Sequence, residues 1–473
     1  MEMHDMVITI IGAGPGGYET AVAAAARGIE VNIVSAGPVG GTCLNEGCIP
    51  TKALCRNAEV LRELHNASRF GISAEGLSFS IGAAMQRKDE VVSQLRGGVE
   101  FLLKNKLIHL VYGMASFKDS HTVAVKAEDG SVLELVSDYI IIATGSQSAT
   151  LPVPGNDIPG VLTSREILSI DHVPERLCVI GAGVIGLEFA SIFHSFGSEV
   201  TVLEYCKDIL PRFDTDMAKR LKQVLGRRGI TIETSSQVQG IERSGDSLGI
   251  RYLKKDKECN VLADNVLMAV GRRPYADGLN LESVGIEFTP KGIVTDANMR
   301  TNVPNIFAVG DVRGGMMLAH VASFEGERAL NTIMAEASGR SPECPLKDGI
   351  DLGIIPAAVF TSPEVAVVGM TEDECQAAGI PVKCLKSMFR ANGKALAMDE
   401  PEGFCKLIAA CEGSSYAPGQ ILGCHIFGAH ASDIIQEVAA LMNMHGTVDD
   451  IRRMVHPHPT LSEVILSAVR QGL

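Results

Sequence analysis

One pattern occurs twice in this chain, and it constrains the possible folds more than any other feature of the sequence. A β-branched run leads into a Gly-x-Gly-x-x-Gly turn, a helix-like stretch follows, and a second β-branched run closes each copy. The matching glycines are Gly12, Gly14 and Gly17 in the first copy and Gly181, Gly183 and Gly186 in the second. Because this order is the context in which such glycines bind a dinucleotide, the sequence predicts an α/β fold with two Rossmann-like domains.

Each glycine of the pattern is needed for a different physical reason. The first permits a tight turn, the second lets a pyrophosphate approach the backbone, and the third allows helix and strand to pack closely. The helix that follows presents unpaired N–H groups and partial positive charge to the phosphates. One such turn is weak evidence, but two in the same context indicate FAD in one site and a nicotinamide cofactor in the other.

The end of the second strand in each copy bears on the choice of cofactor. Glu204 follows "VTVL" in the second copy, where a carboxylate accepts hydrogen bonds from ribose hydroxyls and repels a 2′-phosphate, which favours NAD over NADP. The corresponding residue of the first copy is Ser35, whose hydroxyl is a weaker acceptor. We therefore expect a working but looser ribose site in the first copy.

The composition sets broad limits on the class of protein. The 473 residues are enough for roughly three or four domains, and the net charge of −14 argues against a nucleic acid or an anionic membrane as partner. No apolar run approaches the roughly 18 residues of a membrane span, and a strand-like run begins too early for a signal peptide. The 12 cysteines are scattered, which predicts a reducing compartment: the cytoplasm, of a bacterium in the first place, or an organelle matrix after loss of a transit segment.

Cys43 and Cys48 are the closely spaced pair among those cysteines, in "GGTCLNEGCIPTK". A zinc site needs four ligands, and only Cys55 and His65 lie near the pair, so no metal site is predicted. A permanent disulfide conflicts with a reducing compartment, whereas a disulfide that cycles does not. "IPTKALCRNAEVLRELH" is typical of a helix with Pro50 in its first turn, and a nearby helix N-terminus would stabilise a thiolate.

Several motifs follow one another in an order that resembles a known family. They are the first glycine turn, "GGTCLNEGCIPTK", "ATGS", the second glycine turn, "AVGRRP", "FAVGDV" and "HPHPTLSE". Over essentially its whole length the chain resembles the dihydrolipoamide dehydrogenases, within the pyridine nucleotide–disulfide oxidoreductases. The resemblance implies an enzyme that oxidises protein-bound dihydrolipoamide to lipoamide through a redox disulfide and FAD and reduces NAD⁺ to NADH.

The resemblance also implies roles for individual residues. Cys43 corresponds to the thiol that exchanges with substrate, and Cys48 corresponds to the thiol beside the flavin. Lys52 and Glu188 correspond to a pair near the flavin and the nicotinamide, although Lys52 could also be an ordinary surface lysine. The remaining positions that correspond to cofactor-binding residues are Gly145, Gly271 and Asp311.

The C-terminal motif supplies the expected acid–base pair. By resemblance, His458 and Glu463 come from the opposite subunit, and histidine has the pKa suited to proton transfer between thiols near neutral pH. Glu463 has an alternative interpretation, because Thr460 and Glu463 have the spacing of a helix capping box. His456 is expected to be structural.

The resemblance further implies a homodimer of four-domain subunits. The expected domains are an FAD-binding domain at 1–148, an NAD-binding domain at 149–272, a central domain at 273–346 and an α+β interface domain at 347–473. The expected partners are lipoyl domains of a 2-oxo acid dehydrogenase complex or the carrier protein of glycine cleavage.

Two residues depart from the family's usual pattern. Ser35 stands where an acid is usual, and Glu46 stands at a usually apolar position between the two cysteines. A carboxylate at position 46 would raise the pKa of nearby thiols by Coulomb repulsion. The alternatives are a disulfide reductase for a glutathione-like substrate and a flavin-binding subunit without turnover.

Overall fold

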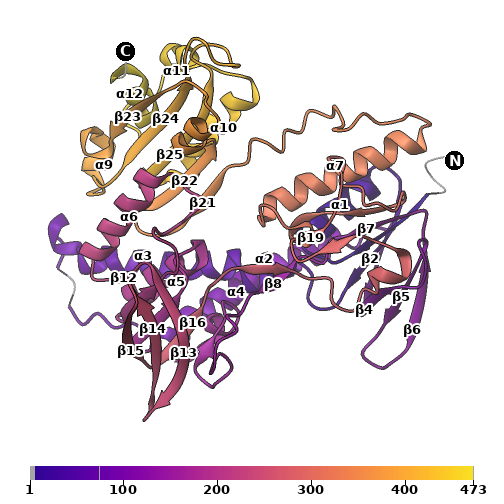
Figure 1. Cartoon of the computed structure of the whole chain (residues 1–473), viewed down its shortest axis with the longest axis horizontal. Helices are drawn as coiled ribbons and strands as arrows, with labels where there is room; N and C mark the ends of the chain where they lie inside the picture. The colour runs from indigo at the N-terminus through magenta and orange to yellow at the C-terminus, as the bar shows by residue number, and fades with distance from the viewer. Residues whose placement is uncertain (1–5, 74, 472–473) are drawn as a thin grey trace. The chain divides into compact units, whose positions relative to one another are not determined.

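The computed structural model describes residues 6–73 and 75–471 of the chain (Figure 1). The chain divides into two compact units, each built from segments that are far apart in sequence. The first unit comprises Met1–Ala53, Ala83–Ala149 and Gly271–Leu352, and the second comprises Leu54–Gly82, Thr150–Val270 and Gly353–Leu473. The division into four domains stays a prediction.

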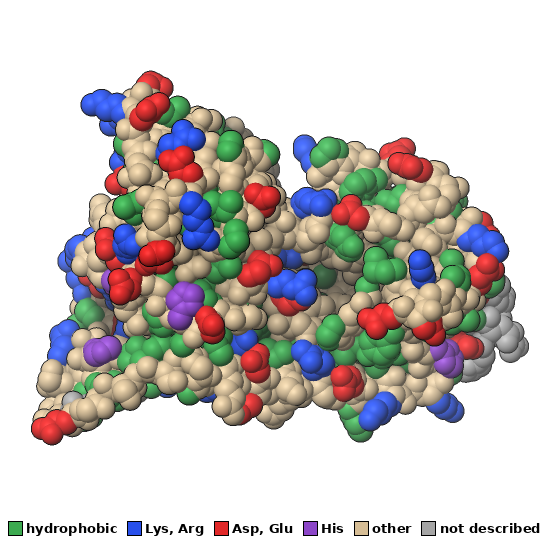
Figure 2. All heavy atoms as spheres, turned by 90° about the horizontal axis from the view of Figure 1, so that it is seen from below, with side chains coloured by type: hydrophobic (Ala, Val, Ile, Leu, Met, Phe, Trp, Pro, Cys, Tyr) green, Lys and Arg blue, Asp and Glu red, His purple; other side chains and the backbone are tan. Residues whose placement is uncertain are grey.

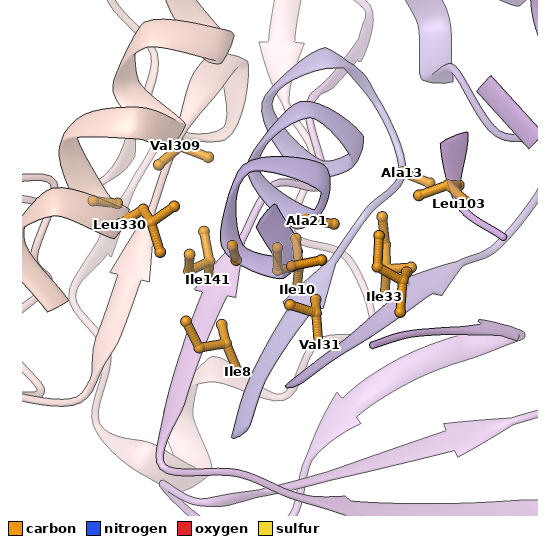
Figure 3. Close-up of a cluster of buried hydrophobic side chains, with 14 of the residues drawn as sticks. Ile8, Ile10, Ala13, Ala21, Val31, Ile33, Leu103, Ile141, Val309 and Leu330 are labelled. Atoms are coloured by element: carbon orange, nitrogen blue, oxygen red, sulfur yellow. The ribbon is translucent and has the colours of Figure 1, made fainter. Parts of the chain in front are cut away.

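A five-stranded parallel sheet forms the centre of the first unit, in the order β20-β7-β1-β2-β3. Its strands are β1 (Val7–Ile11), β2 (Glu30–Ser35), β3 (Ile108–Tyr112), β7 (Tyr139–Ile142) and β20 (Ile306–Ala308). Helices α1 (Pro15–Ala26) and α7 (Ala319–Ala337) pack against each other and share one core with the sheet. Figure 3 shows this core, which includes Ile8, Ile10, Ala21, Val31, Ile33, Ile141 and Leu330.

The opposite face of the same sheet is also covered. Successive residues of a strand point to opposite sides, so Ile10 lies in the core under α1 whereas Ile11 belongs to a second core. An antiparallel sheet contributes to this second core, and its strands are β4 (Met114–Phe117), β5 (Thr122–Lys126) and β6 (Val132–Val136). Parallel strands need such cover on both faces, and these strands are accordingly rich in isoleucine and valine.

The second unit contains another five-stranded parallel sheet, in the order β12-β11-β10-β16-β9. Its strands are β9 (Val161–Leu162), β10 (Arg176–Ile180), β11 (Glu199–Leu203), β12 (Thr231–Glu233) and β16 (Asn265–Met268). Helix α5 (Val184–Phe196) follows β10, and an antiparallel sheet is formed by β13 (Ser236–Ser244), β14 (Ser247–Lys254) and β15 (Lys257–Ala263). The prediction of two Rossmann-like folds in one chain is therefore confirmed.

The C-terminal part of the second unit is an antiparallel sheet with helices packed against it. The strand order is β21-β22-β25-β24-β23. The strands are β21 (Ala357–Val359), β22 (Glu364–Gly369), β23 (Val382–Met388), β24 (Phe404–Ala410) and β25 (Ile421–Gly428). The helices are α8 (Glu372–Ala377), α9 (Gly393–Ala397), α10 (Ala431–Asn443), α11 (Val448–Arg453) and α12 (Glu463–Gln471). This arrangement is α+β, as the predicted fold class requires.

The remaining helices are α2 (Gly41–Glu46), α3 (Cys48–His65), α4 (Ile81–Leu102) and α6 (Thr215–Arg227). The predicted helix with Pro50 in its first turn is confirmed as α3, which begins at Cys48 itself.

The surface drawn in Figure 2 mixes both signs of charge, with Lys and Arg interspersed among Asp and Glu. Across residues 6–73 and 75–471, no helix is long and apolar enough to cross a bilayer.

The contact between α1 and α7 gives a test of the packing in the first unit. A Cβ at Gly326 of α7 would lie 1.9 Å from Thr20 Oγ1 of α1, so we expect Gly326→Ala to destabilise the protein by about 1–3 kcal/mol through overpacking. Gly97 of α4 is the matched control, because a Cβ there meets no atom within 4 Å. Gly97→Ala should therefore stabilise the helix slightly.

Thermal unfolding of the two variants measures the difference. A Gly326→Ala protein that melts at or above the wild-type temperature would contradict this description of the helix contact.

Candidate functional site

At two positions of the first glycine turn, any side chain would clash with the backbone. Gly12 has φ +114°, and a Cβ there would lie 2.2 Å from the carbonyl oxygen of Ala143. A Cβ at Gly17 would lie 1.8 Å from the carbonyl oxygen of Gly12, because α1 runs that close to the turn. Gly14 differs, since the nearest atom to a Cβ there is the Cα of Gly41, 3.8 Å away.

The second glycine turn repeats this geometry. Gly181 has φ +105°, and a Cβ there would lie 2.4 Å from the carbonyl oxygen of Ala269. A Cβ at Gly186 would lie 2.0 Å from the carbonyl oxygen of Gly181. Around a Cβ at Gly183, no atom of the described residues lies within 4 Å.

The middle glycines face space that a ligand can occupy. Gly14 and Gly183 are the N-cap residues of α1 and α5, both have extended backbone, and neither makes a side-chain cap hydrogen bond. The start of each helix can therefore donate to an anion, with the positive end of the helix dipole behind it. In α1 the donor is the Gly16 N–H, because Pro15 has no N–H and the Gly17 N–H donates to the Gly14 carbonyl oxygen. The two turns fit the pyrophosphate groups of FAD and of a nicotinamide dinucleotide.

The ends of the second strands differ between the copies, as the sequence predicts. Glu204 is buried, and its carboxylate accepts hydrogen bonds from the backbone N–H groups of Ala182 and Cys206, both at 2.6 Å. These two bonds hold the carboxylate beside the second glycine turn. Ser35 is also buried, but its hydroxyl donates to the carbonyl oxygen of Gly37 at 2.8 Å. The first copy has no carboxylate at this position.

A second group of residues lies beside the carboxyl ends of β7 and β20 in the first unit. Two short strands pair antiparallel there, β8 (Ser146–Ser148) and β17 (Arg272–Pro274). Arg272 donates from Nε to Ser146 Oγ and from Nη2 to the Ser146 carbonyl oxygen, both at 2.7 Å. Ser146 Oγ in turn donates to Asp311 Oδ2 at 2.5 Å. One guanidinium therefore ties the segments "ATGS", "GRRP" and "VGDV" together.

The glycines of these segments have conformations that suit close approach by a ligand. Gly145 has φ +74° and Gly271 has φ +124°, and a Cβ at either position meets no described atom within 4 Å. Asp311 lies in the short turn Gly310–Arg313. Burial lowers the pKa of Arg272, while the charges of Asp311, Cys48 and Glu46 oppose this effect.

The turn that carries Asp311 has its own support from α7. Glu325 is buried and accepts hydrogen bonds from the Gly310 N–H at 2.6 Å and from the Arg313 guanidinium. Burial raises the pKa of Glu325, and the charge of Arg313 and the Gly310 N–H act against this rise.

The segment just ahead of Cys43 is packed directly against the first glycine turn. The N–H of Gly40 donates to the carbonyl oxygen of Ala13 at 2.8 Å. Gly41 has φ +60°, and a Cβ there would lie 2.6 Å from the Cα of Gly14. Cys43 lies in α2, which begins at Gly41, and Cys48 is the first residue of α3. The two glycines therefore fix the pair beside the turn that fits a pyrophosphate.

The two thiols are close enough to interact. A hydrogen bond with Cys48 and burial raise the pKa of Cys43 well above its usual range, and the positive charge of Lys52 opposes the rise. Cys48 is exposed, and its place at the first position of α3 puts it at the positive end of the helix dipole. Glu46 is not among the main influences on the Cys43 pKa, and its charge acts on Arg272. The effect of Glu46 on the thiols stays a prediction.

His458 and Glu463 are in contact in the second unit. His458 Nδ1 lies 3.0 Å from Glu463 Oε1 and 3.2 Å from Oε2. Glu463 Oε2 also accepts the Thr460 N–H at 2.9 Å, which is one half of a capping box. The other half is absent among the described residues, because Thr460 Oγ1 donates to the Pro457 carbonyl oxygen. Glu463 therefore combines both of its predicted interactions.

The charge on Glu463 is held by the same two groups. The Thr460 N–H and the His458 imidazole lower the pKa of Glu463, so this carboxylate stays ionised beside the imidazole. The side chain of His458 is 78% exposed, whereas that of His456 is largely buried against Glu437, with His456 Nε2 2.9 Å from Glu437 Oε1.

Lys52 and Glu188 are described separately, because they belong to different units. Lys52 lies on α3 four residues after Cys48, about one turn further along. Glu188 is buried on α5, and its Oε1 accepts the Phe360 N–H at 3.0 Å. Their pairing near the cofactors stays a prediction.

Comparison with known proteins shows the family to which this chain belongs. Residues 6–326 match the family described as pyridine nucleotide-disulphide oxidoreductase, and residues 355–469 match its dimerisation domain. The chain belongs to the pyridine nucleotide–disulphide oxidoreductases. Members of this family are flavoproteins that use FAD and a nicotinamide dinucleotide, which agrees with the two glycine turns.

Individual relatives match along almost the whole chain. A dihydrolipoyl dehydrogenase of Chlamydia muridarum is 40% identical over 98% of this chain and 95% of its own length, and one of Bacillus subtilis is 38% identical over 98% of both chains. Among solved structures, LpdA from Mycobacterium tuberculosis has a TM-score of 0.88 at 27% identity, covering 98% of this chain and 99% of its own. The HOCl-induced flavoprotein disulfide reductase RclA from Escherichia coli has a TM-score of 0.85 at 28% identity, with the same coverage.

Sequence reasoning missed the side chains that connect the candidate FAD segments. Arg272 and Ser146 stand inside the motifs "AVGRRP" and "ATGS", but the pattern points to the neighbouring glycines and to Asp311. Glu325 belongs to none of the motifs. The sequence hints at it only through an acidic residue placed among the apolar residues of a helix.

The role of Arg272 can be tested through FAD affinity. Hydrogen bonds to charged groups contribute about 1.5–3 kcal/mol, so we expect Arg272→Met to weaken FAD binding by roughly ten- to a hundredfold. Arg273→Met is the matched control, because the neighbouring Arg273 is exposed and pairs only loosely with Asp277, at 3.4 Å. FAD titration of the apoproteins measures the difference, and equal affinities in both variants would contradict the assignment.

The hydrogen bond between the thiols predicts a pH effect. Because Cys48 raises the pKa of Cys43, Cys48→Ala should shift thiolate formation at Cys43 to lower pH. The rate of iodoacetamide alkylation of Cys43 in the reduced protein, followed by mass spectrometry against pH, measures this shift. Cys344→Ala, at an exposed cysteine, should leave the profile unchanged. A shift to higher pH in Cys48→Ala would contradict the contact, and Glu46→Val tests the further effect of Glu46.

Proposed function

We propose that this protein is a dihydrolipoyl dehydrogenase, which oxidises dihydrolipoamide to lipoamide and reduces NAD⁺ to NADH with release of a proton. The observation that carries the proposal is the Cys43–Cys48 thiol pair, fixed by two glycines against a dinucleotide-binding turn. The names and full-length similarity of the bacterial relatives support the choice of dihydrolipoamide as substrate.

The residues that would hold FAD lie in the first unit. They are Gly12, Gly14, Gly17 and Ser35 at the first glycine turn, with Lys52, Gly145 and Asp311 from the segments beside it. FAD, when bound, supplies a two-electron carrier between the thiol pair and the nicotinamide. The protein supplies the backbone donors, the fixed Asp311 carboxylate and the placement of Cys48.

The residues that would hold NAD lie mostly at the second glycine turn. They are Gly181, Gly183 and Gly186, together with Glu188, Glu204 and Gly271. Glu204 already has both carboxylate oxygens engaged by backbone N–H groups, which fixes its orientation. A fixed anion accepts the ribose hydroxyls of NAD and repels the 2′-phosphate of NADP.

The substrate reacts with Cys43 by thiol–disulfide exchange. A thiolate of dihydrolipoamide attacks Cys43 Sγ of the oxidised pair, the Cys43–Cys48 bond breaks, and Cys48 leaves as a thiolate. The second substrate thiol then attacks the mixed disulfide and releases Cys43. The substrate is oxidised to lipoamide, and the protein disulfide is reduced to two thiols.

Proton transfer in this exchange falls to the histidine–glutamate pair. The imidazole of His458 accepts the proton of the substrate thiol, and Glu463 stabilises the imidazolium through Nδ1. We propose that His458 of the partner subunit serves each thiol pair. The large exposure of His458 and the match to a dimerisation domain support a site completed in a homodimer.

Three further parts of the proposal concern organisation and setting. The subunit is divided into an FAD domain at 1–148, an NAD domain at 149–272, a central domain at 273–346 and an interface domain at 347–473. Its partners are lipoyl-bearing proteins of a 2-oxo acid dehydrogenase complex or of glycine cleavage, and its compartment is the bacterial cytoplasm.

The direct test is reduction of NAD⁺ by dihydrolipoamide with FAD-replete protein. We expect turnover with dihydrolipoamide and NAD⁺, and little turnover when glutathione replaces dihydrolipoamide or NADP⁺ replaces NAD⁺. No turnover, in a protein whose disulfide NADH can reduce, would mean that the substrate is a different disulfide.

Matched histidine variants test the acid–base assignment in the same assay. His458→Gln should lower kcat by about 10²- to 10⁴-fold, the usual contribution of a general acid–base group, and it should alter the pH profile. His456→Gln should retain most activity, because His456 is held by Glu437. Equal losses in both variants would contradict the assignment.

A further inference from the structure

Lys406 is a charged side chain at the centre of the C-terminal sheet. It lies on β24, all of whose residues are buried, and its side chain is 1% exposed. Its neighbour across the sheet is His425 of β25, which is also buried. A buried ammonium group is costly unless it is paired and hydrogen-bonded, so its partners show what holds it there.

The partners of Lys406 are three carboxylates. Lys406 Nζ lies 2.8 Å from Asp214 Oδ2, 2.5 Å from Glu372 Oε2 and 3.4 Å from Asp216 Oδ2. Asp214 is as completely buried as Lys406, at 1% exposure, whereas Asp216 and Glu372 reach the surface. Burial lowers the pKa of Lys406, but its hydrogen bonds to Asp214 and Glu372 raise it more, so the lysine stays charged.

Asp214 connects this ion pair to the segment that follows Glu204. Asp214 is the N-cap of α6, and its Oδ1 accepts the Met217 N–H at 3.3 Å. The preceding segment returns to the second glycine turn, where the Leu210 N–H donates to the carbonyl oxygen of Ala182 at 3.0 Å. The N–H of the same Ala182 donates to Glu204. Residues 205–213 are therefore fixed at Ala182 on one side and at Lys406 on the other.

The other ion pairs between α6 and the C-terminal part are more exposed than the Lys406–Asp214 pair. Asp216 pairs with Lys386 at 2.6 Å, and the side chains of both are about half exposed. Arg220 and Arg227 pair with Glu402 at 3.2 and 3.1 Å. Exposed ion pairs contribute little, because water screens the charges and the long side chains lose freedom. In the Lys406–Asp214 pair both side chains are buried, so the positions of the two charged groups are fixed more tightly than in the exposed pairs.

We infer that Lys406 is a positioning residue for the NAD site: through Asp214 it holds the segment 205–213, and with it Glu204, against the second glycine turn. The inference rests on the proposed NAD site at Gly181–Gly186 and Glu204. It assigns to a residue of the dimerisation domain an effect on the affinity for the nicotinamide cofactor, through a contact with Asp214 that spans 192 residues of sequence.

Binding of NAD⁺ to the oxidised holoenzyme tests the inference. Lys406→Met removes the tie at similar side-chain length, and we expect a Kd for NAD⁺ that is weaker by more than twofold and up to about thirtyfold, the usual range for residues coupled to a site without touching its ligand. The KM for dihydrolipoamide and the FAD content should stay unchanged. Lys386→Met is the matched control, since it removes a lysine from Asp216 at the surface, and its Kd should stay within twofold of wild type.

A double variant separates positioning from stability. Lys406→Met leaves Asp214 buried beside an apolar side chain and could impair folding, whereas Lys406→Met/Asp214→Asn leaves no buried charge, and asparagine still caps α6. We expect the folded double variant to bind NAD⁺ as weakly as Lys406→Met. Wild-type affinity in a folded variant overturns the inference. Failure of the double variant to fold also overturns it, because the pair then serves the stability of the whole unit.

Equilibrium dialysis with NAD⁺ keeps this test independent of the proposed substrate. Absence of NAD⁺ binding in the wild-type protein would refute the proposed NAD site itself. NAD⁺ binding without dihydrolipoamide turnover would refute the proposed substrate and leave the test of Lys406 valid.

Discussion

The close approach of each glycine turn to the strand beside it is the constraint on which the rest of the structure depends. The N–H of Gly12 donates to the Val34 carbonyl oxygen at 2.8 Å, and that of Gly181 donates to Leu203 at the same distance. Neither turn leaves room for a Cβ at its first glycine. Each turn therefore sets where its strand ends and where its helix begins, and it brings the last residue of the second strand to the same edge of the sheet.

In the first unit, the segment that carries the Cys43–Cys48 pair is attached to the glycine turn. Gly40 and Gly41 bring the segment ahead of Cys43 into contact with the turn, and the start of α3 places Cys48 five residues later. The second turn has Leu210 where the first has Gly40, since both donate to the carbonyl oxygen of the alanine inside the turn. The same backbone hydrogen bond to the turn is therefore followed by the thiol pair in the first copy and by helix α6 in the second.

The sequence predicts the parts of this arrangement that depend on neighbours along the chain. The glycine turns, the start of α3 near Cys48 and the carboxylate at Glu204 each follow from local spacing, and the structure has them where the pattern places them. Ser146, Arg272 and Asp311 were not predictable as a group, because 126 and 165 residues separate the bonded pairs. Nothing in a linear pattern reports which motif bonds to which.

Lys406 escaped prediction for a related reason. A lysine in "FCKLIAA" is expected on the solvent face of a strand, since lysine is almost never fully buried unless paired. Its partner Asp214 precedes it by nearly 200 residues and reads in the sequence as an ordinary N-cap of α6. Local propensity is correct for the N-cap Asp214 and wrong about the exposure of Lys406, because it cannot show that the two positions meet.

Both nucleotide edges are held by charges where hydrophobic contacts would serve stability as well. Arg272 ties Ser146 and Asp311 in the first unit, and Lys406 ties Asp214 in the second. Replacing a buried ion pair with apolar side chains is often neutral or even stabilising, so stability alone does not account for either pair. What a hydrogen-bonded charge adds is direction, because its partner must lie at a set distance and angle. Irregular segments and very short strands lack the packing that fixes a longer strand, and a directional bond supplies the placement that a cofactor site on such segments needs.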